Sequence, residues 1–197
     1  MSKLFYQGHG SYRIVTNEGV VIYVDPYIGD GYDMDADIVL VTHEHSDHNK
    51  VELVNLKTDG VIIRSNNLKV GNIYYSTSIN GVGIEAVEAY NKNHNKANCV
   101  GYILRFDGLS LYVSGDTSLT DDMKNKLPGY NLDYALLPTD GIYNMNACEA
   151  AKCAKIIGAK INIPIHTNPT MLFDEEIVKD FNVENKLIIR PNDEIEL

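Results

Sequence analysis

The sequence is poor in cysteine, which limits how its fold can be stabilised. Among its 197 residues, only Cys99, Cys148 and Cys153 are cysteines. Their odd number and their spacing match neither a disulfide framework nor a zinc-finger pattern. The N-terminal segment also lacks the apolar core of a secretion signal, so we expect nothing to be cleaved from it. A reducing compartment, the cytoplasm, is the expected location.

Basic residues are scarce relative to acidic ones. Lysine and arginine together number 17 against 27 aspartates and glutamates, which gives a formal net charge of −10. Binding to a phosphate backbone depends on the opposite balance, because cationic side chains must displace counterions. Long DNA or RNA is therefore not an expected partner. No apolar run approaches the length of a membrane span, so no membrane partner is expected either.

Two common catalytic signatures are absent as well. The chain has no Gly-x-Ser-x-Gly elbow and no phosphate-binding loop, so covalent serine chemistry and nucleoside triphosphate binding lack support in the sequence. There is also no linker, repeat or low-complexity tract. Hydrophobic residues make up 44% of the chain, which is enough for a substantial core. We therefore expect a single domain covering residues 1–197.

The first half of the chain reads mainly as strands. Apolar, β-prone runs predict strands over 3–6, 12–15, 20–24, 38–42 and 61–64. Apolar spacing predicts a short helix over 51–56, and the irregular segment 65–81 is assigned no more than a short strand near 73–75.

Strands and helices are mixed in the second half. Strands are predicted over 83–90, 100–106, 109–114, 134–138 and 161–165, with edge strands over 187–189 and 194–197. Helices are predicted over 120–127, 146–157 and 173–181, the second of them capped by Asn146 with Glu149 and ended by Gly158. This pattern predicts an α/β fold, an αββα four-layer sandwich in which two mixed sheets pack face to face with helices outside.

The strongest chemical signal follows the predicted strand 38–42. The segment His43-Glu44-His45-Ser46-Asp47-His48 places four potential metal ligands within six residues. An extended backbone would point His43 and His45 to the same side, and a turn would direct Asp47 and His48 elsewhere, so one segment can serve two adjacent metals. A solvated polar loop is the alternative, but it would leave half of the chain's histidines clustered for no reason.

Three further residues have ligand chemistry at the ends of predicted strands. His94 follows strand 83–90, Asp116 follows 109–114 after a glycine that permits a sharp turn, and His166 follows 161–165. Each has an ordinary alternative: a surface histidine, a turn or helix-capping aspartate, and a core histidine. Each signal is weak alone.

Together these motifs resemble the metallo-β-lactamase superfamily of metal-dependent hydrolases. The resemblance covers nearly the whole chain and is closest to a compact branch that includes ascorbate-6-phosphate lactonase-like proteins. The motifs that carry it are Gly8-His9-Gly10, Val24-Asp25-Pro26, the segment His43 to His48, Gly115-Asp116-Thr117 and Pro164-Ile165-His166.

The resemblance implies a two-metal centre and hydrolysis of a small ester, lactone or phosphoester. It assigns His43, His45 and His94 to the first metal, Asp47, His48 and His166 to the second, and Asp116 to both. Asp47 would also orient the attacking hydroxide. Zinc is the leading metal, although this nitrogen and oxygen donor set also suits Mn, Fe, Co or Ni.

Other functions on the same fold stay open at this point. An iron-dependent oxidoreductase of the dioxygenase type is the main alternative, although di-iron members typically carry glutamate at the position of His45. A nuclease would need an inserted domain and a less acidic chain, and a non-catalytic binding protein would not need a complete ligand set. The expected partner is a small-molecule substrate, and self-association into a homo-oligomer stays open.

Several residues are placed near the site without a firm role. We expect His9 and Asp25 to support it or to line its rim, with a simple strand-end turn before Pro26 as an equal alternative for Asp25. The loop 27–37, Asp140 and Tyr143 either border a cleft or are ordinary solvated connections.

Overall fold

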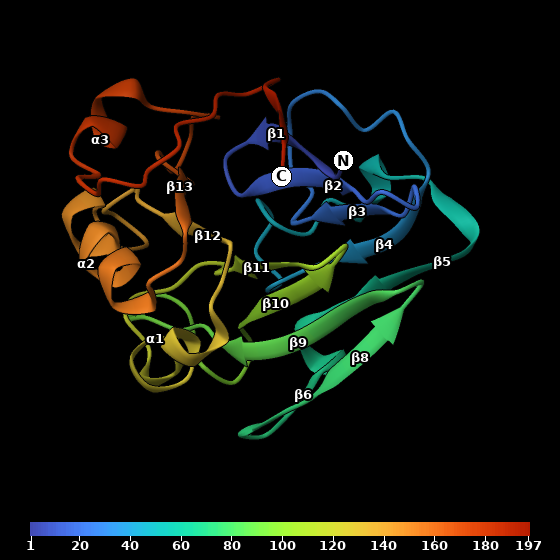
Figure 1. Ribbon diagram of the computed structural model, residues 1–197, viewed down its shortest axis with the longest axis horizontal. Helices are drawn as coiled ribbons and strands as arrows, with labels where there is room; N and C mark the ends of the chain where they lie inside the picture. The colour runs from blue at the N-terminus through green and yellow to red at the C-terminus, as the bar shows by residue number, and fades with distance from the viewer.

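Two six-stranded sheets pack face to face in the computed structural model, which describes residues 1–197 (Figure 1). The first sheet has the order β14-β1-β2-β3-β4-β5, antiparallel from β14 to β3 and parallel from β3 to β5. Its strands are β1 (Lys3–Gly8), β2 (Ser11–Val15), β3 (Val21–Val24), β4 (Ala36–Leu40), β5 (Leu56–Ile63) and β14 (Glu194–Glu196).

The second sheet repeats this mixed arrangement. Its order is β13-β12-β11-β10-β9-β8, parallel from β13 to β11 and antiparallel from β11 to β8. Its strands are β8 (Ser76–Ile79), β9 (Val82–Glu88), β10 (Val100–Phe106), β11 (Leu109–Val113), β12 (Tyr134–Pro138) and β13 (Ile161–Ile165). A hairpin of β6 (Lys69–Val70) and β7 (Ile73–Tyr74) stands apart.

The core follows from alternation along the strands. In β10, Tyr102 and Leu104 face the 25-residue cluster between the sheets, whereas Ile103 faces the helices. In β12, Leu136 faces between the sheets and Leu137 faces the helices. Burial on both faces explains why these strands are almost continuously apolar.

The helices cover the outer face of the second sheet (Figure 1). They are α1 (Asp121–Asn125), the 3₁₀ helix η3 (Leu127–Tyr130), α2 (Ala147–Ile157) and α3 (Glu175–Lys179). The outer face of the first sheet is covered instead by loop and 3₁₀ residues, since Tyr32 and Val51 pack on its Val21, Tyr23 and Val39. The α/β class with two mixed sheets is confirmed.

The helix predicted over 51–56 is wrong. Only the 3₁₀ helix η1 (Val51–Leu53) forms, and Leu56 already begins β5. Its preceding residue, Lys50, provides no side-chain cap, and Leu53 and Leu56 remain exposed. An uncapped segment without a buried apolar face gains too little to continue as a helix.

Smaller differences occur at element boundaries. The predicted helices 120–127 and 173–181 shorten to α1 and α3, and η3 includes the Pro128-Gly129 pair expected to end the first of them. The predicted strand 187–189 does not form, and one isolated bridge joins Asn162 to Lys186 instead. The segment 65–81, largely unassigned from sequence, contains the 3₁₀ helix η2 (Ser65–Asn67), β6, β7 and β8.

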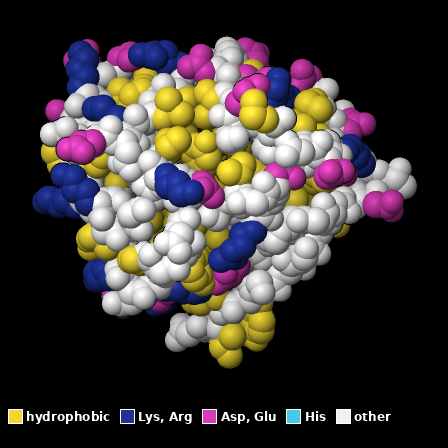
Figure 2. Space-filling model, viewed as in Figure 1, with side chains coloured by type: hydrophobic (Ala, Val, Ile, Leu, Met, Phe, Trp, Pro, Cys, Tyr) yellow, Lys and Arg dark blue, Asp and Glu magenta, His cyan; other side chains and the backbone are white.

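The surface carries charges of both signs. Acidic and basic side chains are interspersed over the face shown in Figure 2, and apolar side chains gather at its lower edge near β6. The β6–β7 hairpin contributes the exposed Val70 and Ile73.

The longest helix, α2, has 11 residues, and no helix has the length and apolar character that a bilayer crossing requires.

The fold brings the ends of several strands to one edge. The chain leaves β4, β9, β11 and β13 at their carboxyl ends and runs directly into the segments that carry His43, His94, Asp116 and His166. Side chains far apart in the sequence are therefore delivered to a common place, as is usual for parallel strands in mixed sheets.

The cap of α2 gives a direct test of the predicted local signals. Asn146 Oδ1 accepts a hydrogen bond from the backbone N–H of Glu149, and Glu149 Oε2 accepts one from the backbone N–H of Asn146. The two bonds form a complete capping box. We expect Asn146→Ala to lower the free energy of unfolding by about 1 kcal/mol, measured by urea denaturation. Asn182→Ala is the matched control, because its exposed side chain makes no hydrogen bond; equal losses in both variants would contradict the assignment.

Candidate metal centre

All six histidines of the chain gather at this strand edge with Asp47 and Asp116. The structure therefore brings together the seven ligand candidates named from the sequence and adds His9 to them. Their nitrogen and carboxylate oxygen atoms form three overlapping groups, in each of which all ligand atoms lie within 4.8 Å of one another. A cluster of this kind is able to bind a metal ion.

The first group consists of His43, His45 and His94. His43 and His45 lie on the bent segment that follows β4, and His43 Nε2 lies 3.2 Å from His45 Nδ1. The ring of His94 reaches them from the loop after β9, with centroids 4.9 Å from both. His43 and His94 are buried, whereas His45 is exposed.

The second group lies on the other side of the same segment. A turn over residues 46–48, closed by the bond from His48 N to His45 O, brings Asp47 toward His9 and His166. His48 stays next to the first group, with its ring centroid 4.2 Å from that of His43. Asp47 Oδ2 lies 3.2 Å from His9 Nε2, 3.8 Å from His166 Nε2 and 4.0 Å from His48 Nε2.

Asp116 lies between the two groups. Its Oδ1 is 3.3 Å from His48 Nε2, and its Oδ2 is 3.2 Å from His94 Nε2 and 3.5 Å from His166 Nε2. The turn that presents it needs Gly115, which has a φ of +60° and whose Cβ position would lie 2.9 Å from Thr42 Cβ. The carboxylate is thus held where the two sheets touch.

A surrounding layer of polar groups fixes the imidazole orientations. Each of four buried histidines places its Nδ1 beside an oxygen of a neighbouring side chain. His43 Nδ1 lies 3.0 Å from Thr42 Oγ1, and His48 Nδ1 lies 2.8 Å from Asp25 Oδ2. His94 Nδ1 lies 3.0 Å from Asn91 Oδ1, and His166 Nδ1 lies 3.2 Å from Asp140 Oδ2. Outer partners of this kind set the ring orientation and leave Nε2 free for a metal.

The structure shows where two residues lie whose role the sequence left undecided, Asp25 and Asp140. Asp25 is both a turn residue, with a φ of +44°, and a partner of His48, and it also accepts bonds from the backbone and hydroxyl of Thr42. Asp140 lies beside His166. Asn91 was not predicted from the sequence. Its Asn-x-x-His spacing is the signal that could have identified it, since Asn91 Oδ1 accepts a hydrogen bond from the backbone N–H of His94.

The electrostatic environment keeps the carboxylates ionised. Burial raises the pKa of Asp116, but His166 and His48 together with the bond from His94 lower it more, so the net pKa lies well below the ordinary range. The pKa of Asp47 is also lowered, because the neighbouring imidazoles of His166 and His9 outweigh the effect of its burial. Two anionic groups in a mostly buried cluster favour the binding of cations.

The pKa values of two buried histidines, His43 and His166, are shifted in opposite directions. Burial holds the pKa of His43 well below its ordinary value, and neighbouring His48 lowers it further. Burial also lowers the pKa of His166, but the surrounding Asp116, Asp140 and Asp47 reverse this effect and raise it to about 10.

The surroundings of two buried nitrogen atoms indicate that these residues fit a metal ion. The Nε2 atoms of His48 and His166 have no hydrogen-bond partner, although carboxylate oxygens of Asp116 lie 3.3 and 3.5 Å away. A buried polar atom without a partner is costly. Imidazole nitrogens and carboxylate oxygens converging in this way fit a divalent cation, which would bind both.

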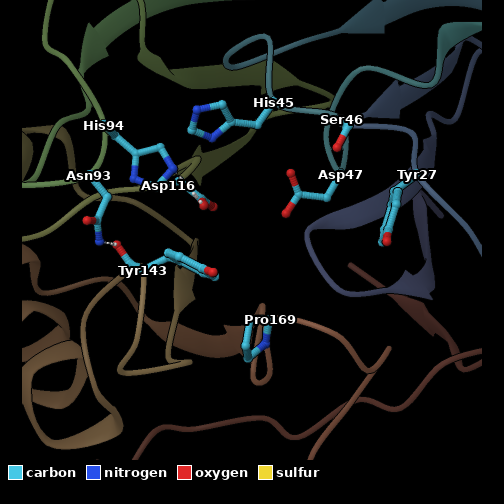
Figure 3. Close-up of a pocket in the computed structure, with 9 residues that line it drawn as sticks. All are labelled: Tyr27, His45, Ser46, Asp47, Asn93, His94, Asp116, Tyr143 and Pro169. Carbon is cyan, nitrogen blue, oxygen red and sulfur yellow. Dashed lines mark hydrogen bonds and ion pairs between the residues drawn. The ribbon is translucent and has the colours of Figure 1, made fainter.

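A cleft of about 470 Å³ opens onto the cluster (Figure 3). His45, Asp47, His94 and Asp116 form one part of its lining. The rest consists of Tyr27, Ser46, Asn93, Tyr143 and Pro169. Of the open candidates for a cleft border, Tyr143 and the start of loop 27–37 therefore line the cleft, whereas Asp140 lies behind it.

Comparison with known proteins supports the same chemistry. Residues 3–166 match the β-lactamase superfamily domain. A UPF0173 metal-dependent hydrolase from Thermococcus kodakarensis is 30% identical over the full length of both chains, and one from Methanoregula boonei is 34% identical over 96% of this chain and 91% of its own. Neither is named as an ascorbate-6-phosphate lactonase, so that finer likeness stays a prediction.

Solved structures agree. A crystal structure from Parabacteroides distasonis, of a protein classed with the metal-dependent hydrolases, is 32% identical, covers 96% of this chain and 92% of its own, and superposes with a TM-score of 0.77. A metallo hydrolase from Ignicoccus hospitalis shares the fold with a TM-score of 0.76 at 23% identity, over 99% of this chain and 98% of its own.

The close approach of Gly115 to Thr42 predicts that adding one methyl group at Gly115 lowers the stability of the fold. Gly115→Ala should cost about 2 kcal/mol more in unfolding free energy than Gly71→Ala, because the new methyl group would overlap Thr42. Gly71 is the matched control: its φ is +59° and nothing lies within 4 Å of its Cβ position, so it isolates the backbone strain. Urea denaturation of both variants measures the difference, and equal costs would contradict the prediction.

Proposed function

This chain belongs to the metallo-β-lactamase superfamily of metal-dependent hydrolases, and from that premise we propose that it hydrolyses a small ester, lactone or phosphoester at a centre of two divalent cations. His43, His45 and His94 would hold the first cation. Asp47, His48 and His166 would hold the second. We extend the proposal to a small-molecule substrate and a cytoplasmic location.

One observation carries the two-cation proposal. The carboxylate of Asp116 lies beside imidazoles of both groups: its Oδ2 is 3.2 Å from His94 Nε2 of the first group, and its Oδ1 and Oδ2 are 3.3 and 3.5 Å from His48 and His166 Nε2 of the second. A carboxylate shared in this way can bind one cation through each oxygen. A single cation would leave one of the two ligand groups without a function.

The bound cations would supply an activated water and polarise the oxygen of the scissile group. The chain's own residues would do the rest. Asp47 is the only carboxylate of the cluster with substantial exposure, 29% of its side chain, so it can receive a proton from a water in the cleft. His9 Nε2, 3.2 Å away, holds that carboxylate in place. Asp25, Asn91 and Asp140 keep the ligand rings oriented.

The donor set favours zinc without requiring it. Imidazole and carboxylate ligands without a thiolate suit Zn²⁺, and they also suit Mn²⁺, Fe²⁺, Co²⁺ and Ni²⁺. Elemental analysis of the purified protein decides among them. Stoichiometric iron together with oxygen consumption and no hydrolysis would favour the iron-dependent oxidoreductase instead.

Two substitutions test the centre. We expect Asp116→Ala to lose most of both metals, because it removes the shared ligand, and His45→Ala to lose chiefly the first. Both should lower turnover by at least about 100-fold. Metal content is measured by plasma mass spectrometry, and turnover with a panel of lactones, phosphodiesters, phosphonates and thioesters.

Asp30→Ala serves as the matched control, because Asp30 is exposed and makes no hydrogen bond or ion pair. No histidine outside the cluster exists to serve in the same way. Full metal content and unaffected turnover in Asp116→Ala would refute the proposed centre.

Metal removal should also destabilise the fold. A ligand present at about 100 times its dissociation constant stabilises the native state by about 2.7 kcal/mol, so chelation should lower the melting temperature by about 5 to 10 °C. Calorimetry with and without a chelator measures the shift. The Asp116→Ala variant should show little shift; an equally large one would place the stabilising metal elsewhere.

A further inference from the structure

The cleft above the metal centre has an aromatic and apolar border. Figure 3 shows the ring of Tyr143 extending into the space below Asp47 and Asp116, with Tyr27 and Pro169 on other sides of the opening. These three residues come from distant parts of the chain. Together they offer flat, weakly polar surfaces next to the position where the reacting group of a substrate would lie.

The same cleft has no cationic side chain. None of its nine lining residues is lysine or arginine. Lys92 is exposed one residue before Asn93 but does not line the cleft, and Arg64 is paired with Glu44 at 2.7 Å. A negative charge on the part of a substrate that lies away from the metals would therefore have no counterion within the cleft.

The backbone around Tyr143 is firmly held. Asp140 Oδ1 accepts the backbone N–H groups of Ile142 and Tyr143, each at 2.7 Å. The carbonyl oxygen of Tyr143 accepts from Asn91 Nδ2 at 3.0 Å and from Asn93 Nδ2 at 2.9 Å. The loop is thus fixed on both sides of this residue.

Two of these holding groups also orient metal-ligand candidates. Asn91 faces His94 Nδ1, and Asp140 lies beside His166 Nδ1. The position of Tyr143 is therefore tied to both ends of the histidine cluster. Its side chain nevertheless remains half-exposed. An aromatic side chain on a fixed backbone at the mouth of a cleft has only two side-chain torsions to order, so it offers contact area at little entropic cost to binding.

We propose that Tyr143 is the principal specificity-determining residue and that the cleft selects substrates whose group beyond the scissile bond is planar and uncharged, such as aryl esters or aryl-substituted lactones. This inference rests on the proposed function and narrows it, since it disfavours substrates that carry a second anionic group. The ring of Tyr143 supplies the contact, and its hydroxyl is not required.

A pair of metal-directed probes tests the selection without requiring turnover. Benzohydroxamate and 4-carboxybenzohydroxamate share a metal-chelating group and differ by one remote carboxylate. We expect zinc-loaded protein to bind benzohydroxamate about tenfold more tightly, because the remote carboxylate finds no lysine or arginine side chain in the cleft. Isothermal titration calorimetry measures both affinities, with metal-free protein as the reference.

Variants of Tyr143 separate the ring from its hydroxyl. Tyr143→Ala should weaken benzohydroxamate binding about fivefold, whereas Tyr143→Phe should leave it unchanged. Tyr75→Ala is the matched control, because Tyr75 is comparably exposed but lies outside the cleft. Ser46→Lys places a cation on the cleft wall and should reduce the preference between the two probes, once equal zinc content is verified.

The outcomes distinguish this inference from the proposed function. Zinc-dependent binding of both probes with equal affinity, or a Tyr143→Ala affinity equal to that of Tyr75→Ala, would overturn the inference and leave the metal centre intact. Binding of neither probe to zinc-loaded protein would count against the metal centre itself, and the inference would fall with it.

Discussion

The structure depends on keeping ionised carboxylates buried among imidazoles. Asp116 is almost fully enclosed, and its charge is tolerated only because His48, His94 and His166 surround it. Those rings must in turn be oriented, which requires an outer set of oxygens. The polar interior at this edge is therefore one connected system, and the apolar core between the sheets serves as the rigid support that keeps it assembled.

Close packing between the sheets sets the geometry of this system. A methyl group at Gly115 would strike Thr42, and one at Gly10 would lie 2.9 Å from His48 Cε1. Backbone strain is concentrated here too, since His9, Asp25 and His166 all have positive φ values between 44° and 57°. Strained residues persist where surrounding contacts fix them, and they commonly occur at functional sites.

Local signals in the sequence predicted most of the fold and the ligand cluster. The spacing of ligand-type residues from His43 to His48 can be recognised within that segment alone. The capping box of Asn146 and Glu149 likewise depends only on residues that are close in the sequence. The predicted helix over 51–56 failed because burial of an apolar face is decided by distant residues. Asn91 has both kinds of contact: its bond to the His94 backbone is local, whereas its bond to the Tyr143 carbonyl exists only in the folded chain and could not be predicted from the sequence.

The turn between β1 and β2 has a consequence for biosynthesis. The ring of His9 packs against that of His166 with centroids 3.7 Å apart, and the carbonyl oxygen of His9 accepts the backbone N–H of His166 at 2.7 Å. The position of His9 thus depends on a residue that is synthesised much later. The second group of ligand candidates includes His166, so it cannot assemble on a nascent chain that stops short of β13.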